Sequence, residues 1–346
     1  MGRPHSLFRH LFRLFLVAGM ALGSSLACQR RSEGASRPPL EVTVAYPTNI
    51  SAALALIAID KGHFLHRGAR WNYLPFETGK AALEQLLAGK ADVAIASETP
   101  IARAILAGGK FKILASIEQS GLDVRIVARR DRGIEAPRDL RGKVIGFTRD
   151  TSGHYFLDSW LLANGLDQSE IRLADLSPIQ SREALIAGTV DAVATWDPHA
   201  QILSTALGGR AVVFQDEFLF TQVFCVVGRP EFIREHPDQV KAILEGLLSA
   251  KNLLRRAPEE SLSAIARLAR ADAGLVAKTL PAHEFDVMLD QSLLVVLENE
   301  CRWMRDTGAT PGLTIPDLYP YLHLPGLLEV NPRKVQVIRR DLRGSP

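Results

Sequence analysis

Hydroxyl and amide side chains stand directly after two apolar runs of the chain, where helices are expected to begin. Thr151 and Ser152 follow one run, and Asn49 and Ser51 follow another that ends at Tyr46. With the free N–H groups of a first helical turn, such side chains can hold an anionic head group such as a sulfonate, carboxylate or phosphate. The alternatives are that Ser and Thr only cap their helices, for which they are preferred, and that Tyr46 packs against its own helix.

Two carboxylates occupy similar places after two other apolar runs. Glu98 stands between Ser97 and Thr99, and Asp197 follows Trp196. A pair of carboxylates facing Thr151 and Ser152 would suit a ligand with a cationic part, such as an amino-sulfonate, because it would repel a simple anion. The alternatives are local. The proline after Thr99 and the proline after Asp197 each suit the first position of a helix, and Trp196 either stacks on a ligand or is buried at a strand end.

Histidines give little support for an enzyme or a metal protein. His154 lies just inside an expected helix and could contact a ligand, but no nucleophile-elbow motif accompanies it. His63 and His66 form an H-x-x-H pair without a third ligand nearby in sequence. We therefore expect no catalytic residue, no metal site and no cofactor.

The elements that would position these side chains alternate between strand and helix. Short apolar runs predict strands over 42–46, 93–96, 111–117, 124–128, 143–147, 192–196 and 211–214. Helical patterns lie between them, over 52–64, 81–88, 152–164 and 182–187. This alternation indicates an α/β fold with mainly parallel sheets. From Pro230 onward the pattern is almost wholly helical.

An internal repeat organises the first part of the chain. The segment 86–94, LLAGKADVA, has a close echo in 185–193, LIAGTVDAV, and the turn ending at Ser51 has an echo in the turn ending at Ser152. Gly89 and Gly188 suit the position after a helix, where φ is positive. Two similar α/β halves predict a cleft between them, with ligand held beyond the carboxyl ends of the strands.

As a set, the motifs of this repeat resemble the periplasmic solute-binding proteins for aliphatic sulfonates, nitrate and taurine, together with the related binders of thiamine precursors. The resemblance covers about residues 42–250, and the segments that carry it are VAYP at 44–47, AGKADVA at 88–94, LRGKVIG at 140–146, TSG at 151–153 and DAVATWDP at 191–198.

The resemblance implies a two-lobe, type II periplasmic-binding fold that closes like a clamshell over an interlobe cleft, with a helical C-terminal part. It implies two crossings between the lobes, near 123–130 and 217–223. We expect one lobe to hold 41–122 plus 223–330 and the other 123–222, with a basic tail over 331–346. The ligand would be a small polar solute contacted by the residues at the strand ends: Tyr46, Asn49, Ser51, Ser97, Glu98, Thr99, Thr151, Ser152, His154, Trp196 and Asp197.

The first 27 residues are typical of a secretory signal peptide. Arg3, Arg9 and Arg13 precede an uncharged apolar run over 14–22, which is too short to span about 30 Å of hydrocarbon comfortably. Ser25-Leu26-Ala27-Cys28 resembles a bacterial lipobox, although Ser25 stands where that pattern usually has Leu. We expect lipidation of Cys28 and a flexible, lipid-anchored tether over 28–40. The alternative is an ordinary signal peptide.

Composition agrees with an exported receptor. The formal net charge is +3, and the leader carries three arginines and no acid, so the remainder is close to neutral and gives no reason to expect nucleic acid. Whether Cys225 and Cys301 pair is left open by the sequence. We expect a monomer on the extracytoplasmic face of a membrane, with an ABC permease and ATPase as partners.

Two other functions remain open at this point. One is an enzyme on the same fold, resembling the lyases of the menaquinone pathway, for which Glu98 or Asp197 would be the catalytic candidate. That group is cytoplasmic, which disagrees with the leader, and the Cys-rich motif of thiamine-precursor synthases is absent from the sequence. The other is a tethered sensor that presents its ligand to a signalling receptor.

Overall fold

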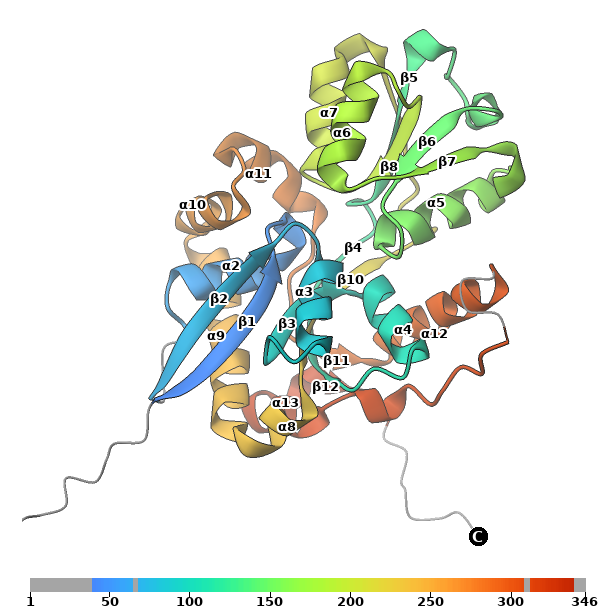
Figure 1. The fold of residues 1–346 in the computed structure, drawn as a ribbon. Helices are drawn as coiled ribbons and strands as arrows, with labels where there is room; N and C mark the ends of the chain where they lie inside the picture. Colours follow the sequence, from blue (N-terminus) through green and yellow to red (C-terminus); the bar gives the residue numbers. More distant parts are fainter. Residues whose placement is uncertain (1–38, 65–67, 308–311, 339–346) are drawn as a thin grey trace, which may run out of the picture. The chain divides into compact units, whose positions relative to one another are not determined.

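Ten strands of the chain form two five-stranded sheets (Figure 1). The computed structural model describes residues 39–64, 68–307 and 312–338, so the predicted leader, Cys28 and the end of the basic tail lie outside the described residues. The first sheet has the order β2-β1-β3-β10-β4 and the second β7-β6-β8-β5-β9. The strands are β1 Leu40–Pro47, β2 Ala69–Phe76, β3 Val93–Ser97, β4 Lys112–Ser120, β5 Arg125–Arg129, β6 Val144–Phe147, β7 Arg172–Asp175, β8 Ala192–Thr195, β9 Ala211–Phe214 and β10 Gln222–Gly228.

The predicted strands and helices are confirmed in kind, with shifted ends, but both sheets are mixed rather than mainly parallel. β1 pairs with β3, and β6 with β7 and β8, in parallel. β10 lies antiparallel between β3 and β4, and β5 lies antiparallel between β8 and β9. Each of these antiparallel strands follows a segment in which the chain crosses from one sheet to the other. β5 follows the crossing over 121–124, and β10 follows the crossing over 215–221.

The repeat seen in the sequence is reproduced in atomic detail. Gly89 and Gly188 have positive φ of 72° and 76°, as predicted for the position after a helix. The aspartate three residues later folds back on the first strand of its own half. The Thr43 N–H donates to Asp92 Oδ2 at 2.8 Å, and the Val144 N–H donates to Asp191 Oδ2 at 2.9 Å. The echo therefore marks one structural unit used twice.

Helices cover both faces of the second sheet. Phe156 and Trp160 of α5 pack with Ile126 and Ile145 on one face. Leu185 of α6 and Leu203 of α7 pack with Val127 and Val193 on the other. The helices within residues 39–228 are α2 Ala53–Asp60, α3 Gly79–Leu87, α4 Glu98–Leu106, α5 Ser152–Ala163, α6 Pro178–Ala187 and α7 His199–Leu207.

The segment after residue 229 is helical, as predicted, and packs against the first half of the chain. Helix α9 runs beside α2, and α12 runs beside α4 (Figure 1). Short bridges join this segment to β4, such as Ser116 with Met288. Its elements are α8 Pro230–Glu235, α9 Pro237–Arg256, α10 Pro258–Ala269, α11 Ala273–Thr279, β11 Leu289–Asp290, α12 Gln291–Asp306, α13 Leu324–Val330 and β12 Val335–Gln336.

Two further findings concern the cysteines and the membrane. Cys225 and Cys301 are both buried and free, which answers the question that the sequence left open. Within the described ranges, none of the helices has both the length and the apolar character that a membrane span requires.

Candidate functional site

A small cavity lies where strands of both sheets end and helices begin. Its volume is about 20 Å³, which is close to the space that a single water molecule needs. Five predicted site residues line it: Asn49, Ser97, Thr151, Ser152 and Trp196. Sequence reasoning missed the other five lining residues, Thr78, Gly79, Lys80, Gln222 and Phe224.

Three helix N-termini meet at this cavity. Thr78 is the N-cap of α3, Ser97 that of α4 and Thr151 that of α5. The side chain of Thr78 accepts a hydrogen bond from the Ala81 N–H, whereas the side chains of Ser97 and Thr151 do not cap their helices. Helix N-termini carry partial positive charge and free N–H groups. This arrangement favours a negatively charged occupant.

Gly79 allows α3 to approach the sheet closely. A Cβ at Gly79 would lie 2.9 Å from Ala96 Cα and 3.2 Å from the Ser97 nitrogen. Such distances are too short for a side chain, so only glycine lets the first turn of α3 reach the end of β3. The Thr-Gly pair that opens α3 was a signal available in the sequence, but the preceding strand β2 was not recognised.

Lys80 is the only charged side chain among the described residues that line the cavity. Its ammonium donates to the Arg149 carbonyl at 3.0 Å and lies 3.6 Å from Asp150 Oδ2. Lys80 follows β2 of the first sheet, and both partners follow β6 of the second. Lys80 therefore lines the cavity, and its ammonium joins the two halves of the chain.

Two buried polar atoms at the cavity lack a hydrogen-bond partner among the described residues. They are Asn49 Oδ1 and Trp196 Nε1, and both residues are almost wholly buried, with 4% and 5% of their surface exposed. An unpaired buried polar atom costs roughly 1–3 kcal/mol. A ligand or water with both a donor and an acceptor would remove this cost.

Glu98 and Thr99 are placed beside the cavity rather than in its lining. The prediction that Pro100 begins the helix is wrong, because α4 already begins at Glu98 and a proline is tolerated anywhere in the first turn. The buried Glu98 carboxylate accepts hydrogen bonds from Ser152 Oγ at 2.7 Å and from the Val223 N–H at 2.7 Å. Burial raises the pKa of Glu98 to about 7, although these hydrogen bonds lower it.

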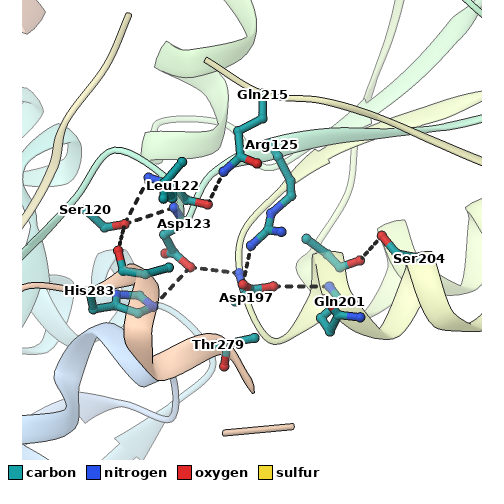
Figure 2. A network of polar contacts seen from close by, with 12 residues as sticks. Ser120, Leu122, Asp123, Arg125, Asp197, Gln201, Ser204, Gln215, Thr279 and His283 are labelled. Carbon is teal, nitrogen blue, oxygen red and sulfur yellow. Dashed lines mark hydrogen bonds and ion pairs between the residues drawn. The ribbon is translucent and has the colours of Figure 1, made fainter. Parts of the chain in front are cut away.

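Asp197 belongs to a buried network at the crossing between the sheets (Figure 2). Its carboxylate pairs with Arg125 and accepts a hydrogen bond from the Gln201 N–H at 3.1 Å. Asp197 therefore binds a backbone N–H in the first turn of α7, as the local alternative predicted. The prediction that Pro198 is the first helical residue is wrong, because Pro198 is the N-cap. Asp197 and Glu98 therefore do not form a carboxylate pair in the cavity lining, which removes the argument for a cationic part in the ligand.

The remaining predicted residues also lie outside the cavity lining. Ser51 Oγ is 3.3 Å from Asp123 Oδ2, to which it donates. His154 packs on Phe147 and Trp303, and burial lowers its pKa to about 4. Tyr46 is buried in the first sheet. A role for these residues in binding stays a prediction.

Comparison with known proteins places the chain in a family. The NMT1-like family matches residues 35–269. The chain belongs to this family. It is 27% identical over 238 residues to a protein of Bacillus subtilis (strain 168) whose name refers to binding of aliphatic sulfonates, covering 67% of this chain and 68% of that protein.

Two further proteins are similar to this chain, one in sequence and one in fold. The taurine-binding periplasmic protein of Escherichia coli (strain K12) is 25% identical over 244 residues, covering 68% of this chain and 75% of that one. The alkanesulfonate-binding protein SsuA of Xanthomonas axonopodis pv. citri, solved bound to MOPS, superposes with a TM-score of 0.72 and 22% identity over 82% of this chain and 98% of that one. The predicted α/β fold of the periplasmic binding proteins is thereby confirmed.

Proposed function

We propose that this protein is the extracytoplasmic substrate-binding component of an ABC importer and binds a small anion between its two lobes. The observation that carries the proposal is the cavity at which three helix N-termini and Lys80 meet, with no carboxylate among the described residues that line it. Fixed partial positive charges of this kind bind anions through backbone N–H groups. The names of the relatives make sulfonates and taurine the first ligands to consider, and the family resemblance of the sequence motifs adds nitrate.

Binding by this protein requires the lobes to move. The cavity of about 20 Å³ has room for roughly one water molecule, so a sulfonate enters only when the two halves separate. Hinge motion over the crossings at 121–124 and 215–221 would open the site. The ligand then acts by shifting the population toward the closed form.

The surroundings of Glu98 and Asp197, the two candidate catalytic residues, favour a protein that binds its ligand over an enzyme that converts it. The Glu98 oxygens accept hydrogen bonds from Ser152, Thr99 and Val223. The Asp197 oxygens are engaged by Arg125 and Gln201. A general acid or base must reach its substrate within hydrogen-bond distance, and neither carboxylate lines the cavity.

The sequence supports a location for the proposed receptor. The leader and the lipobox-like segment at Cys28 favour a receptor that a lipid anchors to the extracytoplasmic face of a membrane, and we expect it to be a monomer. Closure of the lobes around the ligand would form the surface that a permease, driven by its ATPase, recognises.

A thermal-shift screen of the purified full-length protein in detergent tests the proposal. The panel holds ethanesulfonate, taurine, nitrate and, as a cationic control, choline, in Tris buffer because MOPS and HEPES are themselves sulfonates. A ligand at about 100 times its Kd should stabilise the fold by roughly 2.7 kcal/mol, a shift of several degrees. Recovery of the ligand unchanged supports a receptor. Stabilisation by choline alone, or by none of the anions, contradicts the proposal.

A further inference from the structure

Ser152 takes part in two arrangements at once. It lines the anion cavity, and its hydroxyl donates to Glu98 Oε1 at 2.7 Å. A serine hydroxyl has one proton to donate and two lone pairs. While Glu98 is ionised and accepts this hydrogen bond, the Ser152 hydroxyl can offer only lone pairs to the cavity, and these repel an anion.

Within the part of the chain that the structure describes, no cation is paired with the Glu98 carboxylate to fix its charge. Its side chain is fully buried. The titratable groups that face it are Tyr155 on α5, Cys225 on β10, Glu118 on β4 and Glu300 on α12. All of these described neighbours are acids, so an ionised Glu98 is stabilised by hydrogen bonds alone. Such a group changes its protonation more readily than a salt-bridged carboxylate does.

The contacts of Thr99 suit a cluster that already holds a shared proton. Thr99 Oγ1 lies 3.1 Å from Glu98 Oε1 and 3.1 Å from Glu300 Oε1. The one hydroxyl proton can donate fully to only one of these oxygens, and a proton on Glu300 would make the other contact a good hydrogen bond. Burial and the nearby Glu98 raise the pKa of Glu300 well above its usual range. The consistent chain is that protonated Glu300 donates to Thr99, Thr99 donates to Glu98, and Ser152 donates to Glu98.

We propose that Glu98 is a proton-controlled positioning residue for the anion site, so that binding of an anion is coupled to the uptake of one proton by its carboxyl group. The proton comes from solvent and forms the O–H bond of neutral Glu98. That O–H donates to Ser152 Oγ, and the Ser152 hydroxyl is then free to donate to the anion in the cavity. The negative charge behind Ser152 disappears in the same step.

This inference rests on the proposed function, because it concerns the same cavity. It predicts the direction of a pH effect. Burial raises the pKa of Glu98 to about 7, so Glu98 is protonated in the free protein at lower pH and ionised at higher pH. Anion affinity should therefore be constant below about pH 6 and fall by up to about tenfold per pH unit above pH 7.

Calorimetric titration of the full-length protein with ethanesulfonate tests this coupling, since that ligand keeps one negative charge throughout. We expect the Kd to rise about tenfold from pH 7.5 to 8.5. Titrations in buffers of different ionisation enthalpy should show uptake of close to one proton per ligand at about pH 8. In Glu98→Gln, whose amide donates to Ser152 at every pH, affinity should stay near the low-pH value and proton uptake should vanish.

Asp158→Asn is the matched control. Burial also raises the pKa of Asp158 to about 6, but this carboxylate accepts hydrogen bonds from Trp303 and Gln168 rather than from Ser152. The variant should keep the pH dependence of the wild type. A pH-independent Kd in the wild type, or an unchanged pH dependence in Glu98→Gln, overturns the inference while leaving the anion receptor intact. If Glu98→Gln does not fold, proton uptake by the wild type decides, and its absence at pH 8 overturns the inference. Failure of ethanesulfonate, taurine and nitrate to bind at any pH overturns the proposed function as well.

Discussion

The backbone N–H of Asp197 donates to Oδ1 of Asp123 across 3.0 Å, inside the crossing between the two sheets (Figure 2). The other carboxylate oxygen of Asp123 accepts from Gln222 Nε2 at 2.9 Å and from Ser51 Oγ at 3.3 Å. Asp197 follows β8 of the second sheet, whereas Gln222 begins β10 of the first sheet and Ser51 follows β1 of that sheet. One buried carboxylate therefore ties both halves of the chain to the segment about which they would hinge.

Replacing Asp123 should destabilise the protein strongly. In Asp123→Asn one carboxylate oxygen becomes an NH₂ group, which would face donors from Asp197, Gln222 or Ser51. Leaving buried donors without an acceptor, and removing the charge beside His283, should lower the free energy of unfolding by about 2–4 kcal/mol. Urea denaturation measures this change. Glu217→Gln, on an exposed side chain of the other crossing, should stay within about 0.5 kcal/mol of the wild type. Equal effects would contradict a special role for Asp123.

His283 should make stability fall with rising pH. Its Nδ1 lies 2.7 Å from Glu118 Oε1 and its Nε2 3.7 Å from Asp123 Oδ1. Burial lowers the pKa of His283, but the carboxylates of Asp123, Glu118 and Asp197 outweigh this effect and raise the pKa to about 9. An unfolded histidine releases its proton near pH 6.5. The stabilisation is therefore complete below about pH 6.5 and is lost as the pH rises through about 9.

Urea denaturation between about pH 7.5 and 9 should show a loss of about 1–2 kcal/mol. His283→Gln should be less stable near pH 7 and should lack most of this slope. His236→Gln, a histidine outside the network, should keep the wild-type slope. A wild type whose stability does not change over this range would show that His283 is not held in its charged form.

The sequence predicted the site residues that follow recognisable strands and missed those that follow strand β2. Asn49, Ser97, Thr151, Ser152 and Trp196 meet because buried apolar runs are easy to recognise and the carboxyl ends of parallel strands share one edge of a sheet. Strand β2, with the sequence ARWNYLPF, is half exposed and carries a proline, so its pattern did not reveal it. Thr78, Gly79 and Lys80 were missed with it.

The pairing of strands that are distant in sequence was the other limit on predicting the site. β10 inserts between β3 and β4, and nothing local in the sequence indicates that Gln222 and Phe224 come to lie beside Ser97. The start of a helix also decides where its side chains point. α4 begins at Glu98 and not at Pro100, and the Glu98 carboxylate accepts hydrogen bonds from Thr99 and Val223 and does not line the cavity.

Gly79→Ala should damage the site through the backbone. The new Cβ would lie 2.9 Å from Ala96 Cα, and neither backbone can yield without moving α3 away from β3. Overpacking of this kind costs about 1–3 kcal/mol. We expect a lower melting temperature and weaker binding of ethanesulfonate. Gly209→Ala is the matched control, because its Cβ would meet nothing within 4 Å, and it should change neither quantity appreciably. Unaltered binding in Gly79→Ala would show that the position of α3 does not matter.

Trp303 and Asp158 should be energetically coupled across the two halves of the chain. Trp303 Nε1 on α12 donates to Asp158 Oδ2 on α5 at 3.0 Å, and burial raises the pKa of Asp158 to about 6. A hydrogen bond to a charged group contributes about 1.5–3 kcal/mol. A double-mutant cycle of Trp303→Phe and Asp158→Asn, followed by urea denaturation at about pH 8, should give a coupling energy of about 1–2 kcal/mol. Arg302→Gln paired with Asp158→Asn should give a value near zero. Additive effects of the first pair would exclude the contact.

Lys80 should determine how strongly anions bind and how that binding depends on salt. Its side chain lines the cavity and is 31% exposed, and its ammonium lies 3.6 Å from Asp150 Oδ2. In Lys80→Gln the Kd for ethanesulfonate should rise about fivefold to thirtyfold, corresponding to roughly 1–2 kcal/mol for a charge-assisted contact. The wild-type Kd should rise with ionic strength more steeply than that of the variant, because salt screens the lost charge. Lys90→Gln, on the exposed turn after α3, is a control that should bind as the wild type does. Equal salt dependence in wild type and Lys80→Gln would mean that helix N-termini alone attract the anion.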